Sequence, residues 1–384
     1  MVSRRSLGHA QLPLDPLSVG DCQIINVKQR IKMQTTRVTQ TAMPAGLIPA
    51  GKLNPTYRGL LPVLALCFAT TGWGQTGPGI RAPYRPPPNH SEVAAAVALP
   101  ETGNARDHYK FISIDIKGST YAVASSINDD GLVTGYYLDS NSVSHGFVWR
   151  DGDFRMVDYP GATSTSLGQV SNRGVAIAVY GDGVAQHTVT YSVESRTWTA
   201  LPDIPGYSRN DGYGINEAGV AVGNAFSSTA TVAWIWDPTT RSYYFFTVPG
   251  ADANSTSPSG LNDKGQIAGY YSTEMGSVYH GFIKEYATFT TVDMPGTIDT
   301  YPDGINNNGV IQGQIFANTS YVAQGFIGTS GGAFEAVNYP GPWMTALVGI
   351  SDRGDVCGAY SPIGVWTVAT AFVAFRHEGR SFEP

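Results

Sequence analysis

A nine-residue stretch that starts at Ile127, I-N-D-D-G-L-V-T-G, recurs five more times along the chain. The glycine shared by successive copies is separated by 43, 45, 46, 44 and 45 residues. A period of this length matches one supersecondary unit and predicts an array of similar units, which we number one to six. The six copies begin at Ile127, Val170, Ile215, Leu261, Ile305 and Ile350.

Each copy has the residues of a tight turn between two strands. Asn or Ser at the second position accepts a hydrogen bond from the backbone two residues on, and Gly three residues later allows a positive φ. Alternating apolar residues follow the Gly. We therefore expect one strand to enter the turn and another to leave it.

Three further landmarks follow the turn in a fixed order. In unit one they are H-G-F-V-W at 145–149, a D-G turn at 151–152 and F-R-M-V-D-Y-P-G at 154–161. Units four and five repeat this order, whereas units two and three keep mainly the Pro-Gly end. Four short strands in each unit predict an all-β fold, a six-bladed β-propeller of four-stranded blades.

The D-G hairpin of unit one predicts which side chains face each other. A two-residue turn puts Trp149 opposite Phe154, Phe147 opposite Met156 and a His opposite an Asp. In unit five the His becomes Gln and the Asp becomes Asn, which we interpret as direct side-chain contact with a structural role inside an inter-blade core. A catalytic His/Asp dyad is the alternative, but amides cannot act as acids or bases. The pairs are His145 with Asp158, His280 with Asp293, and Gln324 with Asn338.

The two ends of the repeat region complement each other. Phe111 to Gly118 resembles the fourth strand of a unit, and the chain stops at Pro384 where the fourth strand of unit six is due. The N-terminal strand is therefore expected to complete the last blade, so that residues 111–384 close without an exposed edge.

The N-terminal part differs in charge from the repeats. Residues 1–110 hold 12 Lys and Arg against 5 Asp and Glu, whereas residues 111–384 hold 12 against 25. The apolar run at 60–69 is too short to span a bilayer, so residues 1–74 are expected to contain a signal peptide, with a start codon placed too far upstream. Residues 75–110 are Pro-rich and are expected to form a linker.

Of the three cysteines, Cys22 and Cys67 precede the expected cleavage site. Cys357 follows a repeat turn, where the other units have Thr134, Ile177, Val222, Ala268 and Gln312. We expect a buried small side chain at this position and no disulfide in the mature protein.

The pattern I-N-x-x-G-x-I-x-G, then H-x-F, then D-x-P-G resembles the HAF-type extracellular repeats of predicted secreted bacterial proteins. The chain writes H-G-F at His145 and His280 and lacks the triplet in units two, three and six. The resemblance implies export and a propeller-like array, and it implies no reaction.

The sequence has no motif of a catalytic centre, a phosphate-binding loop or a metal site, and no cofactor is expected. The net charge of −13 over the repeats argues against nucleic acid and anionic membranes as partners. We expect a monomer without a membrane span, secreted or periplasmic, that binds an extracellular protein or glycan without catalysis. A polysaccharide lyase or glycoside hydrolase is the alternative. The candidate ligand-binding residues follow the Pro-Gly sequences, in loops at one end of the channel, and are Arg209, Asp211, Asp252, Asp299 and Tyr301.

Overall fold

The computed structural model describes residues 108–317, 322–341, 343–362, 365 and 367–377. The expected signal peptide and almost all of the expected linker lie outside the described residues. Within the described part the chain forms 24 strands and no helix, so the all-β prediction is confirmed. No helix there is long and apolar enough to cross a membrane.

The strands succeed each other in groups of four, one group for each sequence unit. Unit one contains β2 (Tyr121–Ile127), β3 (Val133–Leu138), β4 (Ser144–Arg150) and β5 (Asp153–Val157), and unit two contains β6 (Ser164–Val170), β7 (Val175–Gly181), β8 (Gln186–Ser192) and β9 (Thr197–Ala200). Unit three contains β10 (Arg209–Ile215), β11 (Ala221–Phe226), β12 (Thr231–Asp237) and β13 (Ser242–Phe246), and unit four contains β14 (Ser257–Leu261), β15 (Ile267–Thr273), β16 (Val278–Glu285) and β17 (Thr288–Val292). Unit five contains β18 (Thr297–Ile305), β19 (Ile311–Ala317), β20 (Ala323–Gly328) and β21 (Phe334–Ala336), and unit six contains β22 (Trp343–Ile350), β23 (Val356–Pro362) and β24 (Thr370–Arg376).

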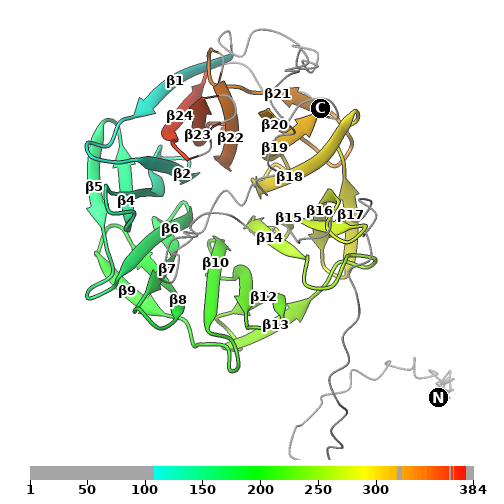
Figure 1. Ribbon diagram of the computed structural model, residues 1–384, viewed down its shortest axis with the longest axis horizontal. Coiled ribbons are helices and arrows are strands. Elements are labelled where there is room, and N and C mark those ends of the chain that lie inside the picture. Colours follow the sequence, from blue (N-terminus) through cyan, green and yellow to red (C-terminus); the bar gives the residue numbers. More distant parts are fainter. Residues whose placement is uncertain (1–107, 318–321, 342, 363–364, 366, 378–384) are drawn as a thin grey trace, which may run out of the picture. The chain divides into compact units, whose positions relative to one another are not determined.

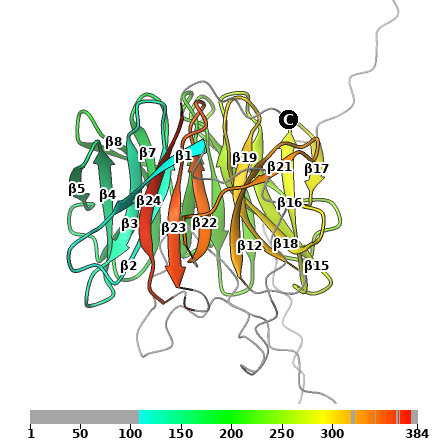
Figure 2. The same cartoon turned by 90° about the horizontal axis from the view of Figure 1, so that it is seen from above.

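The sheets stand around a central axis, and the first strand of each unit is the innermost (Figure 1). These innermost strands contact each other in the closed sequence β2, β6, β10, β14, β18, β22 and back to β2. Seen from the side, most strands run roughly along the axis (Figure 2). This arrangement is that of a β-propeller.

The N-terminal strand completes the sheet of unit six. β1 (Tyr109–Ile114) pairs antiparallel with β24, from Tyr109 opposite Arg376 to Ile114 opposite Ala371. The outermost position of this sheet is thus filled by residues that precede all six units, as predicted. Because strands from the two ends of the repeat region share hydrogen bonds, the ring is closed by backbone pairing.

The strands do not divide into six separate sheets. Four sheets have four strands each, whereas the strands of units two and three form one eight-stranded sheet. The two units are joined by a single parallel pair between Arg209 of β10 and Gln186 of β8. The N–H of Gln186 donates to the carbonyl of Ser208 at 3.1 Å, and this contact connects the two units.

The Asn of the repeated turn holds its own turn and the next unit together. In unit one, Oδ1 of Asn128 accepts the N–H groups of Asp130 and Leu132 at 3.1 and 3.0 Å. Its Nδ2 donates to the carbonyl of Ser171 in unit two at 3.1 Å. Gly131, at φ 70°, allows the chain to turn here. The Asn of units three, four and five makes the same set of bonds.

The next residue of each turn forms a second set of bonds, which we call the turn ring. In every unit its side chain accepts a backbone N–H of the preceding unit, at 2.7 to 3.0 Å. The last bond, from the N–H of Asp352 to the Asp129 carboxylate at 2.8 Å, joins unit six to unit one. The turn ring consists of Asp129, Asn172, Glu217, Asp263, Asn307 and Asp352.

Apolar side chains fill the spaces between neighbouring units. Leu132 and Val148 of unit one, for example, pack with Leu167 and Val189 of unit two. Cys357 is fully buried in such a cluster, and burial raises the pKa of its thiol. Its expected burial is confirmed.

Candidate functional site

Each innermost strand contains a β-bulge at the same place, a few residues before the turn. The register shifts lie between residues 124 and 126, 167 and 170, 212 and 214, 258 and 260, 302 and 304, and 347 and 349. A bulge leaves one residue out of the ladder and redirects its side chain. The residue so displaced is Ser125, Gly168, Tyr213, Ser259, Asp303 or Val348, and in unit two Gln169 lies outside the ladder as well.

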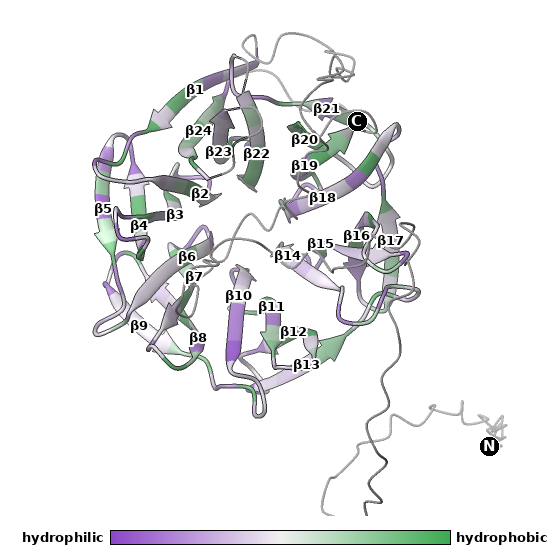
Figure 3. Cartoon of the chain, in the orientation of Figure 1, coloured by the Kyte–Doolittle hydropathy of each residue, from purple (hydrophilic) through white to green (hydrophobic). Residues whose placement is uncertain are grey.

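All six displaced residues line one cavity inside the ring, with a volume of about 70 Å³. The innermost strands differ in polarity: β10 and β14 are mostly purple to pale, whereas β22 is mostly green (Figure 3). The cavity therefore has different chemistry on each side, although the backbone repeats around it. The lining is completed by Ser126, Gln169, Ser257, Pro258, Tyr270, Gly304, Ile305, Gln312, Gly349 and Ile350.

The wall formed by unit five carries polar atoms that have no protein partner. Oδ2 of Asp303 is fully covered and makes no hydrogen bond. Burial raises the pKa of Asp303 well above its ordinary value, and a hydrogen bond from the Gln314 side chain opposes this only partly. The Gln312 side chain is fully buried, yet neither Oε1 nor Nε2 has a partner. Its amide lies against Gly304, the residue after Asp303, because a Cβ placed on Gly304 would meet Nε2 at 2.7 Å.

The residues that correspond to Gln312 in other units use their polar groups within the fold. Thr134 of unit one donates to the carbonyl of Gly168 at 2.7 Å. Cys357 of unit six lies 3.4 Å from the carbonyl of Ala124, with Sγ as donor. An unsatisfied buried amide costs free energy. The Gln312 amide therefore differs from Thr134 and Cys357 in that it makes no hydrogen bond within the fold.

Gln169 closes one side of the cavity. Its Nε2 donates to the carbonyl of Leu261 at 2.8 Å, and its Oε1 accepts the N–H groups of Leu261 and Ile215 at 3.2 and 3.3 Å. One side chain of unit two thus bridges units three and four. Gln169 also lines a second cavity, which is surrounded by the repeated turns. Ser126, Ile305 and Ile350 also line both cavities.

Four of the five predicted ligand-binding residues lie in innermost strands and not in loops. Arg209 and Asp211 both belong to β10. Nη2 and Nε of Arg209 lie 2.5 and 2.7 Å from Oδ2 of Asp211, whose side chain is buried. The guanidinium also lies over the ring of Phe226, 4.8 Å from its centroid. The Tyr213 hydroxyl donates to Oδ2 of Asp211 at 3.4 Å, which connects this ion pair to the cavity.

Asp299 and Tyr301 lie on β18, the strand that carries Asp303. Oδ1 of Asp299 accepts the N–H of Tyr279 at 3.0 Å. Tyr301 is buried, and its ring centroid lies 5.1 Å from that of Tyr270, which lines the cavity. Burial raises the pKa of Tyr301 well above its ordinary value. Neither of these two predicted residues is among the residues that line the cavity.

Asp252 is the one predicted residue that lies in a loop, between β13 and β14. Its Oδ2 accepts the Ser272 hydroxyl at 3.1 Å and the N–H of Gly276 at 2.8 Å. Of the predicted residues, Arg209 and Asp211 are thus in contact with each other. Asp252 instead bonds to the hairpin between β15 and β16.

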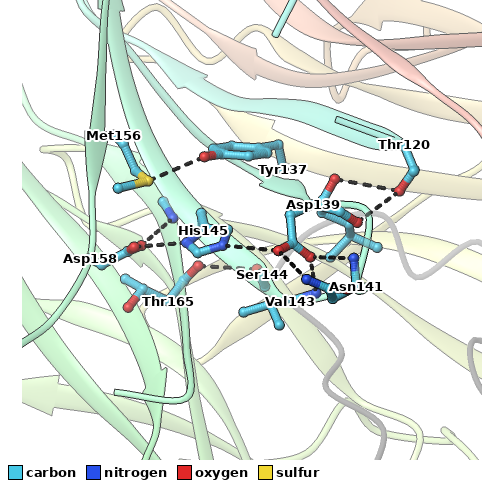
Figure 4. Close-up of polar contacts among 12 residues, drawn as sticks. Thr120, Tyr137, Asp139, Asn141, Val143, Ser144, His145, Met156, Asp158 and Thr165 are labelled. Atoms are coloured by element: carbon cyan, nitrogen blue, oxygen red, sulfur yellow. Dashed lines mark hydrogen bonds and ion pairs between the residues drawn. The ribbon is translucent and has the colours of Figure 1, made fainter. Parts of the chain in front are cut away.

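The predicted His and Asp side chains of unit one are in contact (Figure 4). Nδ1 of His145 lies 2.8 Å from Oδ2 of Asp158, and Oδ1 of Asp158 accepts the N–H of Gly146 at 3.2 Å. The strand register matches the one predicted from the turn at 151–152. In unit four the distance from His280 to Asp293 is also 2.8 Å. In unit five Asn338 accepts the N–H of Gly325 at 2.9 Å, as Asp158 does for Gly146, next to Gln324.

The surroundings of these pairs differ from the expected inter-blade core. Phe147 and Trp149 are buried, but Phe154 and Met156 on the outermost strand are exposed. The side chain of Asp158 is 31% exposed. The pairs lie at the outer part of each sheet, because a His on the third strand meets an Asp just after the fourth.

A third pair, in unit two, was not predicted. Nδ1 of His187 lies 2.8 Å from Oδ1 of Asp203, and its Nε2 lies 3.3 Å from Oδ2 of Asp182. Burial lowers the pKa of His187, but the two carboxylates outweigh this effect and raise it. Unit two lacks the H-x-F triplet, so the pair has no sequence signature there. The Tyr180 ring stacks on His187, as Tyr137 does on His145.

The described residues contain no group of three or more His, Cys, Asp or Glu side chains that could hold a metal ion. Sequence reasoning did not identify Asp303 and Gln312. The available signal for Asp303 was the position three residues before the Asn or Ser of each turn, where the six units have Ser, Gly, Tyr, Ser, Asp and Val.

No protein-family model and no curated protein matches the chain. Solved structures resemble it in fold. TolB from Acinetobacter baumannii matches with a TM-score of 0.47 and 9% identity, over 65% of this chain and 66% of TolB, just under two thirds of its length. A luciferin-regenerating enzyme matches with a TM-score of 0.42 and 10% identity, over 71% and 96% of the two chains. The β-propeller domain of the Trilobed protease from Pyrococcus furiosus matches with a TM-score of 0.39 and 11% identity, over 68% and 82%. These similarities concern the fold alone, and the β-propeller assignment rests on the strand pairing described above.

Proposed function

We propose that this protein is a non-enzymatic binding protein that takes a small polar ligand into the cavity lined by the six bulges. One observation carries the proposal. The fully buried Gln312 amide and Oδ2 of Asp303 have no protein partner, and both residues line a cavity. Buried polar groups are nearly always hydrogen-bonded, so these atoms need a partner from outside the protein, and a polar ligand in the cavity would supply it.

The proposal includes the architecture and setting that the repeats suggest. We count the eight-stranded sheet as two blades, since one parallel pair joins its halves, which gives six blades. We also propose that the chain is one of the HAF-type extracellular repeat proteins and is exported. Detection of the mature protein outside the cytoplasm, cleaved near residue 74, is the expected result, and a cytoplasmic full-length chain would contradict it.

The composition of the lining favours binding over hydrolysis of a polysaccharide. A glycosidase needs two carboxyl groups on either side of the scissile bond. Among the described residues that line the cavity, Asp303 is the one carboxylate. The pair of Arg209 and Asp211 and the loop at Asp252 are engaged within the chain, and we assign them a supporting role.

A ligand screen with a cavity-filling variant tests the proposal. Ser259→Tyr places in unit four the residue that unit three has at the same position, Tyr213, so the bulge should accept it. Ser228→Tyr, on an exposed loop, is the matched control. The full-length protein is screened by thermal shift against a library of small polar compounds and oligosaccharides, and hits are titrated by calorimetry.

We expect saturable binding that Ser259→Tyr abolishes and Ser228→Tyr retains. Absence of any ligand, or binding that Ser259→Tyr leaves intact, would contradict a cavity site. The same compounds are assayed for turnover. Polysaccharide degradation that disappears on Asp299→Asn would replace the proposal with the enzyme alternative.

A further inference from the structure

The ligand class can be inferred from the groups that line the cavity. Positive side chains are absent from this set: no Lys, Arg or His is among the described residues that line it. An anionic ligand would therefore meet the Asp303 carboxyl without a compensating charge. The ligand is either neutral or cationic.

The unpartnered atoms favour a donor-rich ligand. Oδ2 of Asp303, Oε1 of Gln312 and Oγ of Ser125 all accept hydrogen bonds and have no partner in the protein. Only Nε2 of Gln312 is restricted to donation. Tyr213 and Tyr270 also line the cavity, and the face of a tyrosine ring attracts a cation. An ammonium group, with three donors and a positive charge, meets these conditions.

We propose that the cavity binds a small primary ammonium ion, whose N–H groups donate to Asp303 and Gln312. This inference rests on the proposed function and specifies its ligand. The volume of about 70 Å³ fits a group of a few non-hydrogen atoms. The excess of 25 acidic over 12 basic residues in 111–384 attracts a cation toward the ring.

Proton release provides a signature of the ion pair. Burial raises the pKa of Asp303, and the residues nearest to it, Gln312 and Gln314 of β19, are uncharged. Tyr213 and Tyr270 are the other titratable groups in the lining, and Tyr301 precedes Asp303 on β18. An ammonium ion stabilises the ionised carboxyl, so binding should release a proton, and affinity should rise with pH over the range in which Asp303 is protonated in the free protein.

Ethanolamine and ethylene glycol form a matched pair of probes, because they differ only in an amine against a hydroxyl. Glycolate is the anionic probe. Calorimetry on the full-length protein should show ethanolamine binding about tenfold or more tightly than ethylene glycol, since hydrogen bonds to charged groups are the stronger ones. Asp303→Asn should remove this preference, and Asp153→Asn, at an exposed position on β5, should leave it unchanged.

Each outcome decides the question. Stronger binding of ethylene glycol or glycolate, blocked by Ser259→Tyr, would overturn the ammonium assignment and leave the cavity site in place. Undetectable ethanolamine binding, or binding that Asp303→Asn does not weaken, would also overturn it. The cavity site itself would be disproved by a different result, in which the library screen finds no ligand whose binding Ser259→Tyr abolishes. If Asp303→Asn does not fold, proton uptake or release by the wild-type protein in buffers of different ionisation enthalpy gives the same decision.

Discussion

The turns and the bulges lie three residues apart along the same six strands, yet they differ in how far their residues repeat and in how their polar atoms are hydrogen-bonded. At the turns the units have nearly the same residues, and the side chains bond each unit to the next. At the bulges every unit differs from its neighbours, and Asp303 and Ser125 keep polar atoms without protein partners. Repetition with satisfied hydrogen bonds indicates a structural role, whereas variation with unsatisfied ones indicates a binding site.

The largest effect should come from opening the ring, on which both regions depend. Deletion of residues 109–114 removes the strand that pairs with β24 and the buried side chains of Tyr109 and Ile114. We expect a loss of about 3–6 kcal/mol in the free energy of unfolding from the lost burial alone. The exposed edge of β24 should also cause aggregation. Urea unfolding and size-exclusion chromatography measure the two effects, and a monomer of unchanged stability would contradict closure by β1.

Removal of one turn side chain should cost less but remain clearly measurable. Asn306→Ala loses the bonds to Asn308, Val310 and Ser351 and leaves buried backbone groups unpaired. We expect a loss of about 2–3 kcal/mol in urea unfolding. Asn308→Ala, at an exposed position of the same turn, loses one bond to the carbonyl of Asp352, which water can replace; it is the control and should cost at most about 0.5 kcal/mol. Equal losses for the two variants would mean that the repeated Asn is not a structural device.

Addition of a missing turn bond should stabilise the ring. Ser171 occupies the Asn position in unit two, and no hydrogen bond from its side chain to unit three is observed. Ser171→Asn copies the other units and should gain about 0.5–1 kcal/mol. A rise in the melting temperature checks this expectation. A decrease would show that the spacing between units two and three does not allow the bond.

The His and Asp pairs should contribute little. Since the side chain of Asp158 is 31% exposed, water compensates for part of the lost contact. His145→Ala should therefore cost about 1 kcal/mol or less, and the double change to Gln and Asn, taken from unit five, should recover part of it. Chemical denaturation measures both. A loss above about 3 kcal/mol would indicate that the pair is far more important than its exposure suggests.

Much of the fold could be predicted from the sequence because turn residues have local causes. The spacing of the repeated Gly gave the units, and the D-G turn gave the register of Phe147 with Met156. The fusion of units two and three depends on one backbone contact at Gln186, which leaves no residue pattern. The site was harder to predict, since a bulge brings residues from six units to one cavity. Asp303 is unremarkable in the sequence, whereas Asp211 is conspicuous there but bonded to Arg209 in the structure.

The most direct test of the account is to measure stability and binding together for Gln312→Met. Methionine keeps most of the volume but removes both unpartnered polar atoms, so the free energy of unfolding should be unchanged or higher by up to about 1 kcal/mol. Ethanolamine binding, measured by calorimetry on the same preparation, should fall by about tenfold. A loss of stability of about 2 kcal/mol or more with binding intact would show that the Gln312 amide serves the fold, and would contradict the central claim.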